Sequence, residues 1–267
     1  MAMLNKKRKE WKMRGRVFFA LILAMCLSVA GYSLYEKEQN QHDEERIEDV
    51  YYSYDEHGPD AANVCERGMM QSPVQITRKD ALQNQSPEIE IHYGEGRFEI
   101  IKKAHTAEAV SKSGQNYILI DHQQYKLESF HFHLPSEHQV EGQSYEMELH
   151  FVHENKNGEQ AVMAVFIQEG QANEMVKEIW SRLQDGFSKK DNVSIRLPEF
   201  IPKERRAFYY TGSLTTPPCT EGVKWIVFEM PVEFSEEQIG TFHRLFGNNS
   251  RQVQPLNGRK IYQLTVR

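Results

Sequence analysis

The chain contains 267 residues, carries a formal net charge of −6 at pH 7, and is 39% hydrophobic and 26% charged. A chain of this length can bury a sizeable core, as one large domain or two small ones. The mild acidity argues against nucleic acid as a partner, because nucleic-acid-binding domains usually present a basic surface.

The first 35 residues have the layout of a targeting segment. Basic residues between Lys6 and Arg16 precede an uncharged, apolar run from Val17 to Tyr35. This order is typical of a secretory signal peptide, and Ser28-Val29-Ala30 offers a cleavage site. The run is also close to the ~20 residues that span a bilayer, so a membrane anchor is the alternative. Cys26 could end a lipoprotein signal, although Met25 stands where a small residue is expected.

The charges around this run predict the location of the protein. Basic flanks stay in the cytoplasm, so we expect the remainder of the chain outside it, as a secreted, periplasmic or cell-surface protein. A polar linker at 36–49 and a single domain at 50–267 follow, because the latter range shows no internal repeat and no second linker.

Two cysteines, Cys65 and Cys219, lie in this domain. An even pair in an exported domain predicts a disulfide. The alternative, two buried free thiols, is less favoured in an oxidising compartment. Because the closed loop is long, the chain-entropy model gives a stabilisation of roughly 4–5 kcal/mol.

The domain is predicted to be mainly β, of the α+β class. Segments rich in β-branched and aromatic residues, or continuously apolar, predict strands at Glu88–Tyr93, Asn116–His133, Gln143–Glu154, Gln160–Gly170 and Val223–Phe234. Segments with one apolar face predict helices at Asn173–Gly186 and Ser235–Gly247, the second opening with a Ser235/Gln238 capping box. We therefore expect one large, mostly antiparallel central sheet with short peripheral helices.

Histidines cluster near the middle of the chain, in the stretch "FHFHLPSEH". On a strand, His131 and His133 point to the same side, together with Ser129 and Leu127, while the phenylalanines between them point to the other side. The next predicted strand carries Glu148, His150 and Val152 on one face. If the two strands pair antiparallel, His150 meets the first two histidines.

Three converging imidazoles suit Zn²⁺, and three protein ligands leave a fourth position open, as in catalytic sites. A lone histidine is more often a satisfied strand or surface residue. An H-x-H pair followed by a third histidine on the adjacent strand instead favours a metal site on the sheet. We predict the zinc ligands to be His131, His133 and His150.

The segments "FHFH", "SEH", "ELHFVH" and "GSLTTPPC" together resemble the α-class carbonic anhydrases, here of the exported bacterial type. "QSPVQI" at Gln71–Ile76, "GP" at Gly58-Pro59 and "QPL" at Gln254–Leu256 also match, in the family's order across essentially the whole domain. The resemblance implies reversible hydration of carbon dioxide to bicarbonate and a proton, by attack of a zinc-bound hydroxide on CO₂. The substrate would be CO₂/bicarbonate and the cofactor Zn²⁺.

The resemblance also implies roles for individual residues. Thr215 matches the threonine that accepts a hydrogen bond from the hydroxide, and Glu137 matches the carboxylate that accepts the threonine's proton. Glu148 matches the carboxylate that receives a ring N–H from a ligand histidine. His105 matches the proton shuttle, with Lys102 and Lys103 near enough to depress its pKa. Thr216 is the expected bicarbonate contact, and the apolar wall beside the metal is expected from Val152, Val162, Leu214 and Trp225.

Other residues receive weaker interpretations. His138 and His153 are expected to be structural or exposed, His153 because it lies on the opposite face from His150. The matching residues Tyr54 and Tyr210 are expected to buttress the site or pack in the core, and Arg251 is expected to be structural. Cys65 and Cys219 match positions that are disulfide-bonded in many exported members.

The chain departs from the family pattern at several positions. Ser129 stands where a glutamine often supports the first ligand histidine, so that support is expected to be weaker or to run through water. Lys103-Ala104, Ala62 and Tyr52 are further departures. Two other function classes remain as alternatives: a non-catalytic binding module of the same fold, and a hydrolase such as an esterase with a similar zinc site. The three retained histidines argue against the first, and the lack of an obvious ester pocket argues against the second.

Overall fold

The computed structural model describes residues 64–83, 86–184 and 192–267, all within the compact unit Val50–Arg267. The predicted signal or anchor, the linker, Gly58-Pro59 and Gly186 lie outside the described residues, as do Tyr52, Tyr54 and Ala62. Within the described ranges, no helix is both long and apolar enough to cross a membrane.

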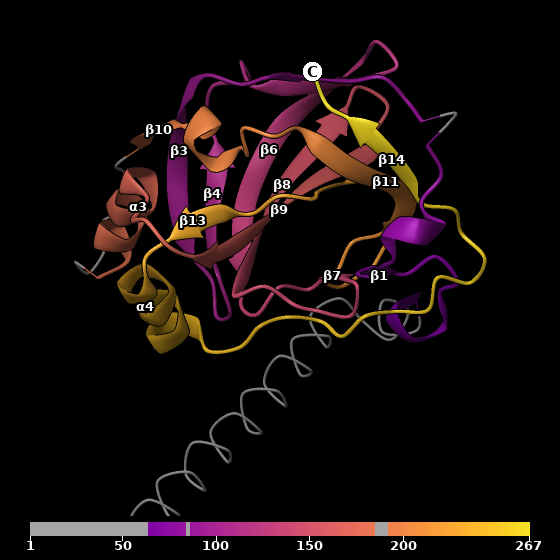
Figure 1. The fold of residues 1–267 in the computed structure, drawn as a ribbon. Coiled ribbons are helices and arrows are strands. Elements are labelled where there is room, and N and C mark those ends of the chain that lie inside the picture. The colour runs from indigo at the N-terminus through magenta and orange to yellow at the C-terminus, as the bar shows by residue number, and fades with distance from the viewer. Residues whose placement is uncertain (1–63, 84–85, 185–191) are drawn as a thin grey trace, which may run out of the picture. The chain divides into compact units, whose positions relative to one another are not determined.

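The centre of the fold is a sheet of 12 strands in the described part of the chain. Its main path runs β10-β3-β4-β6-β8-β9-β12-β11-β14 (Figure 1), while β5 pairs with β6 and β2, and β13 pairs with β9. The strands are β2 (Ile89–His92), β3 (Glu95–Lys102), β4 (Ala107–Ser111), β5 (Tyr117–Ile120), β6 (Gln123–His133), β8 (Met147–Asn155), β9 (Gln160–Glu169), β10 (Val193–Arg196), β11 (Arg206–Ser213), β12 (Glu221–Phe228), β13 (Val232–Phe234) and β14 (Tyr262–Thr265). Only the pairings of β9 with β12 and β13 are parallel in this sheet, so the predicted fold class is confirmed.

Smaller elements surround this sheet. Strands β1 (Gln75–Ile76) and β7 (Gln139–Val140) form a parallel pair, and η2 (Arg78–Asp80) and η3 (Leu197–Phe200) are short 3₁₀ turns. The helices α3 (Glu174–Gln184) and α4 (Glu236–Phe246) lie side by side at one end of the sheet (Figure 1). The predicted capping box of Ser235 is present, and α4 ends at Gly247.

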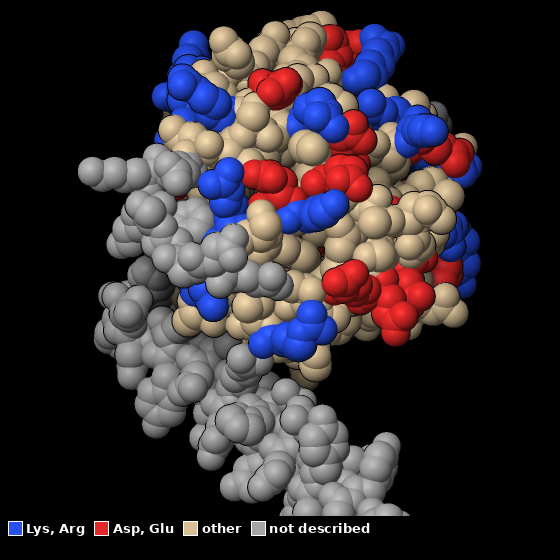
Figure 2. Space-filling view, turned by 90° about the vertical axis from the view of Figure 1, so that its left-hand side faces the viewer, with Lys and Arg blue, Asp and Glu red and all other residues tan. Residues whose placement is uncertain are grey.

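Acidic and basic side chains are interspersed on the side of the molecule that carries the two helices (Figure 2). Two of the ion pairs there join residues three or four apart, Arg182 with Glu178 at 3.0 Å and Arg196 with Glu199 at 3.4 Å. Such exposed pairs contribute only about 0.2–1 kcal/mol each. The helices are therefore held mainly by their apolar faces, which bury Met175, Val176, Ile179, Trp180 and Leu183 from α3 and Phe242 and Phe246 from α4.

Each face of the sheet carries its own apolar cluster. Because side chains alternate along a strand, β9 sends Met163 and Val165 into one cluster and Val162 and Ala164 into the other. The first cluster also holds Phe130 and Phe132 of β6, and it packs against the two helices. The three histidines lie on the opposite side of the same strands.

A β-bulge in β6 corrects one prediction. Leu127 pairs with His153 of β8, but Ser129 pairs with Val152, so Glu128 is an extra residue on β6. The extra residue reverses the alternation, and Leu127 is buried in the same cluster as Phe130. The expectation that Leu127 shares the face of His131 is therefore wrong.

The segment predicted as one extended stretch, Asn116–His133, is two strands joined by a tight turn. Asp121 and His122 link β5 to β6 with positive φ angles of 48° and 64°. Two positive angles in a two-residue connection are typical of a type I′ hairpin, where glycine or asparagine is the usual signal. Asp121 also accepts a hydrogen bond from the backbone N–H of Glu88 at 2.9 Å, which helps to hold the turn.

His153 lies away from the other histidines, as expected, and it is fully buried. Its Nδ1 donates to the carbonyl of Ala161 at 3.2 Å, so its Nε2 accepts the Tyr93 hydroxyl at 2.6 Å. Burial lowers the pKa of His153 from 6.5 to about 4, and hydrogen bonds to backbone groups of Ala161 and Phe151 oppose this shift only in part. The imidazole is therefore neutral in the folded protein at pH 5, where the unfolded chain binds a proton.

This difference predicts an acid-sensitive contribution to stability. Because the unfolded state binds more protons between pH 6.5 and 4, the free energy of unfolding rises with pH across that window. The contribution of His153 is fully present above pH 6.5, and about 3 kcal/mol is lost as the pH falls to 4. Urea unfolding at pH 7 and pH 4.5 should show a smaller pH dependence for His153→Gln than for the unsubstituted chain. An equal pH dependence would contradict the assignment.

Candidate metal centre

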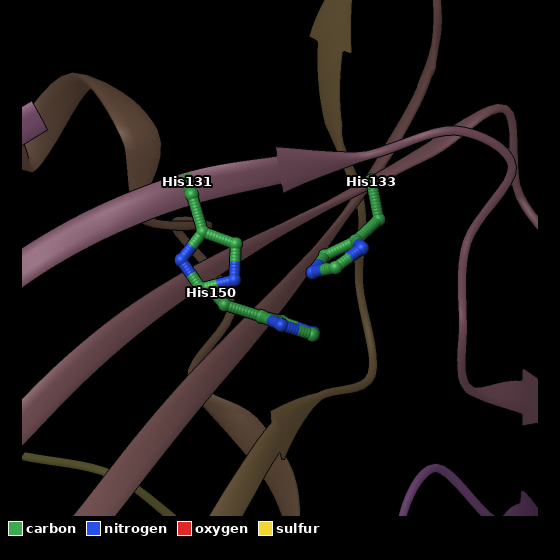
Figure 3. A group of neighbouring side chains, drawn as sticks. All are labelled: His131, His133 and His150. Atoms are coloured by element: carbon green, nitrogen blue, oxygen red, sulfur yellow. The ribbon is translucent and has the colours of Figure 1, made fainter. Parts of the chain in front are cut away.

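Strands β6 and β8 bring the three histidines together. The strands pair antiparallel, and His131 lies directly opposite His150 in the register. The imidazoles converge (Figure 3), with ring centroids 5.0 Å apart for His131 and His133 and 4.5 Å apart for His133 and His150. One ring nitrogen from each histidine lies within 4.8 Å of the others. The strand geometry thus forms the triad that the spacing predicts.

Hydrogen bonds fix which nitrogen of two of these rings faces the centre. Nε2 of His150 lies 2.8 Å from Oε1 of Glu148, so it carries the proton and leaves Nδ1 as the free lone pair. Nδ1 of His133 lies 3.3 Å from the carbonyl oxygen of Asn249. Nε2 of His133 is buried and has no hydrogen-bond partner in the described part of the chain. An orphaned buried nitrogen of this kind fits a metal-ligand position.

The electrostatics of the triad favour neutral rings. Burial, together with repulsion from the neighbouring imidazoles His133 and His150, holds the pKa of His131 well below its usual value. Burial also lowers the pKa of His133 to about 4, although Glu137 opposes the shift. Neutral imidazole is the form that binds metal, so the donor set fits Zn²⁺.

The carboxylate of Glu148 organises the region behind the triad. Its Oε1 accepts from His150 and, at 2.7 Å, from Nδ1 of His138, while its Oε2 accepts the backbone N–H groups of Glu137 and His138 at 2.8 Å each. Burial raises the pKa of this carboxyl, but attraction to the two histidines outweighs that effect, and the pKa lies well below the usual value. Glu148 is therefore an ionised acceptor of four donors.

Replacing Glu148 with glutamine should weaken metal binding. One of the two acceptor oxygens would become an NH₂ group that faces two N–H donors, so the four hydrogen bonds around this side chain could not all be kept and His150 would be held less firmly. We expect zinc affinity to fall about 10- to 100-fold, the usual effect of removing a partner of a ligand histidine. Competition with a chromophoric chelator measures this, with Glu154→Gln on the exposed side of β8 as control. Equal affinities for the two variants would count against the role of Glu148.

The carboxylate of Glu137 lies beside a second ring of the triad, that of His133. Its Oε1 accepts the backbone N–H of Arg251 at 2.8 Å and lies 3.3 Å from Nδ1 of His133. Its Oε2 is buried and has no hydrogen-bond partner among the described residues, so it is free to accept a hydroxyl. The predicted partner, Thr215, is buried on the loop between β11 and β12.

The loop that carries Thr215 and Thr216 is closed by several bonds. Leu214 donates to the carbonyl of Thr220 at 3.0 Å, and Cys219 donates to that of Thr216 at 3.0 Å. The predicted disulfide is present and joins Cys219 to Cys65, 154 positions away, with Cα atoms 5.1 Å apart. The loop is therefore attached to the N-terminal part of the domain.

The predicted apolar wall forms one surface. Val162 and Trp225 are buried in the cluster on the histidine side of the sheet, and Val152 and Leu214 are half-buried against it. The Trp225 ring lies 4.9 Å from the ring of His150. These four side chains therefore place apolar surface beside the triad.

His105 and Ser129 occupy the remaining predicted positions. His105 is half-buried, and burial and then the charge of Lys103 lower its pKa, while Glu108 and Glu137 oppose the shift. Lys102 lies instead over the ring of Phe246. The hydroxyl of Ser129 donates to Glu108 at 2.9 Å.

Three contributors to the site were not predicted. His138, expected to be structural or exposed, is fully buried and donates to Glu148, and its Nε2 lies 2.7 Å from the hydroxyl of Tyr210. Asn249 contacts His133, and Arg251 contacts Glu137 through backbone atoms. Backbone contacts of this kind leave no signal in residue type, so the sequence could not have identified them.

The fold and the triad define a class of protein, a β-sheet domain with three converging histidines that could hold a metal ion. Residues 54–265 match the family model for eukaryotic-type carbonic anhydrase. A carbonic anhydrase of Pectobacterium carotovorum is 32% identical over 260 residues, covering 93% of this chain and 99% of the relative. The α-carbonic anhydrase of Thermovibrio ammonificans, solved with the inhibitor sulfanilamide, is 37% identical with a TM-score of 0.70, covering 77% of this chain and 91% of that chain.

The chain belongs to the eukaryotic-type, or α, carbonic anhydrase family. The resemblance stated from the motifs and the prediction that the chain is a carbonic anhydrase are therefore confirmed. Dioscorin complexed with ascorbate superimposes with a TM-score of 0.72, covering 80% of this chain and 92% of that chain, at 24% identity. That likeness shows the fold alone, so the chemistry must be argued from the site.

Proposed function

We propose that the protein binds one Zn²⁺ ion through His131, His133 and His150 and uses it to hydrate CO₂ reversibly to bicarbonate and a proton. The observation that carries the proposal is the convergence of three imidazoles whose ring nitrogens lie within 4.8 Å of one another. One of these nitrogens is buried and has no hydrogen-bond partner among the residues that the structure describes. Zinc held by three histidines lowers the pKa of a bound water to about 7, a value established for carbonic anhydrase, and so supplies the nucleophile.

The remaining residues would direct this chemistry. If Thr215 donates its proton to Oε2 of Glu137, the threonine oxygen can act only as an acceptor, which would orient the nucleophile. The apolar wall of Val152, Val162, Leu214 and Trp225 suits CO₂, a molecule without a net dipole. Thr216 lies on the same loop as Thr215 and would contact bicarbonate. His105 would carry the released proton towards solvent, since a histidine can take up and release protons near neutral pH.

Stopped-flow measurement of CO₂ hydration tests the proposal. The zinc-loaded protein should accelerate hydration, lose this activity with a chelator, and be inhibited by sulfanilamide, the inhibitor bound in the Thermovibrio relative. A folded, zinc-loaded protein without hydration activity would overturn the assignment.

We also propose that the enzyme works outside the cytoplasm, with residues 1–35 acting as a cleaved signal or as a membrane anchor. The N-terminal charge pattern and the Cys65–Cys219 disulfide support this, because disulfides persist in oxidising compartments. N-terminal sequencing of the mature protein distinguishes the two forms. Recovery of active enzyme only from the cytoplasm would contradict export.

A further inference from the structure

The chain between α4 and β14 reaches the candidate metal centre at two points. The carbonyl of Asn249 lies 3.3 Å from Nδ1 of His133, and the backbone N–H of Arg251 donates to Oε1 of Glu137 at 2.8 Å. Residues 247–261 contain no helix or strand. Backbone hydrogen bonds hold the connection on both sides of Arg251, from Asn249 to the carbonyl of Leu134 at 3.0 Å and from Gln254 to that of Pro73 at 2.7 Å. Two side chains add further anchors.

The first anchor is the side chain of Asn249. Its Nδ2 donates to the carbonyls of His105 and Phe132 at 2.8 and 2.9 Å, and its Oδ1 accepts the N–H of Leu134 at 2.7 Å. These bonds fix Asn249 to the end of β6, where the metal-binding histidines lie.

The second anchor is the guanidinium of Arg251. Nη2 donates to the carbonyl of Cys65 at 2.6 Å, and Nη1 donates to the carbonyl of Ser72 at 2.8 Å and to Oε1 of Gln71 at 2.9 Å. The acceptors belong to the segment 65–72, which the disulfide joins to the loop of Thr215. A planar guanidinium with several donors holds such a set of acceptors in one geometry.

We propose that Arg251 is a positioning residue for Glu137, because its side chain fixes the backbone N–H that holds one carboxylate oxygen and leaves the other for Thr215. The inference rests on the proposed function, in which Glu137 orients Thr215. Without this anchor, the N–H of residue 251 would be held only through the bonds of Asn249 and Gln254 on either side of it, and Glu137 could rotate towards Nδ1 of His133, already 3.3 Å from its Oε1.

Arg259 offers a matched control. It lies in the same connection, is similarly half-buried, and its Nη2 donates to the carbonyl of Gln71 at 2.8 Å. Its other hydrogen bonds go to the carbonyls of Leu256, Pro255 and Thr211, and none goes to Glu137. Its guanidinium also lies over the ring of Tyr210, 5.6 Å from the centroid, but the Tyr210 hydroxyl is held separately by Ser72 and His138. If the loss of activity arises only because this connection is detached from the segment 65–72, Arg259→Gln should therefore show the same loss.

The test compares Arg251→Gln, Arg251→Lys and Arg259→Gln in the zinc-loaded full chain. We expect Arg251→Gln to lower kcat/KM for CO₂ hydration at least about 10-fold at unchanged zinc content, and Arg251→Lys to recover part of the loss. Arg259→Gln should lower the Tm but keep kcat/KM within about twofold. Equal losses of kcat/KM in the two glutamine variants would overturn the proposal.

A double-mutant cycle with Glu137→Gln shows whether the effect of Arg251 on the hydration rate passes through Glu137. If Arg251 acts through Glu137, Arg251→Gln should change the residual rate of the Glu137→Gln enzyme by less than about twofold, read at raised enzyme concentration. The same fold-loss in both backgrounds would show that Arg251 acts elsewhere. An unsubstituted, zinc-loaded enzyme without hydration activity would instead overturn the proposed function, and the role of Arg251 with it.

Discussion

Replacing His133 with alanine should remove both bound zinc and CO₂ hydration. Structural zinc sites with four ligands bind with about 10–16 kcal/mol, so one ligand accounts for roughly 3 kcal/mol, or on the order of a hundredfold in affinity. Nε2 of His133 is buried and has no hydrogen-bond partner among the described residues, so alanine removes a ligand atom without breaking another hydrogen bond of that nitrogen. The loss of hydration should exceed the loss of affinity, because any metal retained would lack the three-histidine geometry.

The control for this experiment is His122→Ala. His122 lies in the β5–β6 turn, and its side chain is 80% exposed, so its removal should change neither zinc content nor rate. Zinc content by atomic absorption and stopped-flow hydration are measured on both variants. A His133→Ala protein that hydrates CO₂ as fast as the unsubstituted protein would favour a function outside this site.

Replacing both Cys65 and Cys219 with serine should give the largest loss of stability. The disulfide closes a loop of 154 positions, for which the chain-entropy model gives about 5 kcal/mol. For a domain of this size, such a loss corresponds to a Tm lowered by about 10–20 °C. The bridge also holds the Thr215 loop against the segment 65–72, so hydration should fall before the protein unfolds.

Differential scanning calorimetry of the zinc-loaded proteins measures this effect. The unsubstituted protein measured with a reductant serves as control, because breaking the same bridge chemically should lower its Tm while leaving that of the double-serine variant unchanged. A double-serine variant with the Tm of the unsubstituted protein would show that the crosslink does not stabilise the domain.

The metal triad could be predicted because it depends on simple strand geometry. An H-x-H pair needs only an extended backbone to place both rings on one side, and the antiparallel neighbour supplies the third ring. The helices were also predictable, since the capping box of Ser235 and Gly247 mark the two ends of α4. Alternation and caps are local features, which residue types record directly.

Features that depend on register or on backbone atoms could not be predicted. The bulge at Glu128 reverses the alternation of side chains along β6. A prediction that assumes regular alternation therefore places Leu127 on the wrong face of the sheet. The turn at Asp121 and His122 lacks the glycine that usually marks such a hairpin. His138 is distinguished from a surface histidine by its burial and by its contacts with Glu148 and Tyr210, which depend on how the chain folds back after β6.

Zinc titration of the metal-free protein tests the central claim most directly. Hydration of CO₂ should rise in proportion to added zinc and reach a plateau at one equivalent, while His133→Ala shows no such rise. A rise to a plateau at one equivalent would support a single catalytic zinc at His131, His133 and His150. Full hydration activity before any zinc is added, or none after one equivalent has bound, would contradict the account.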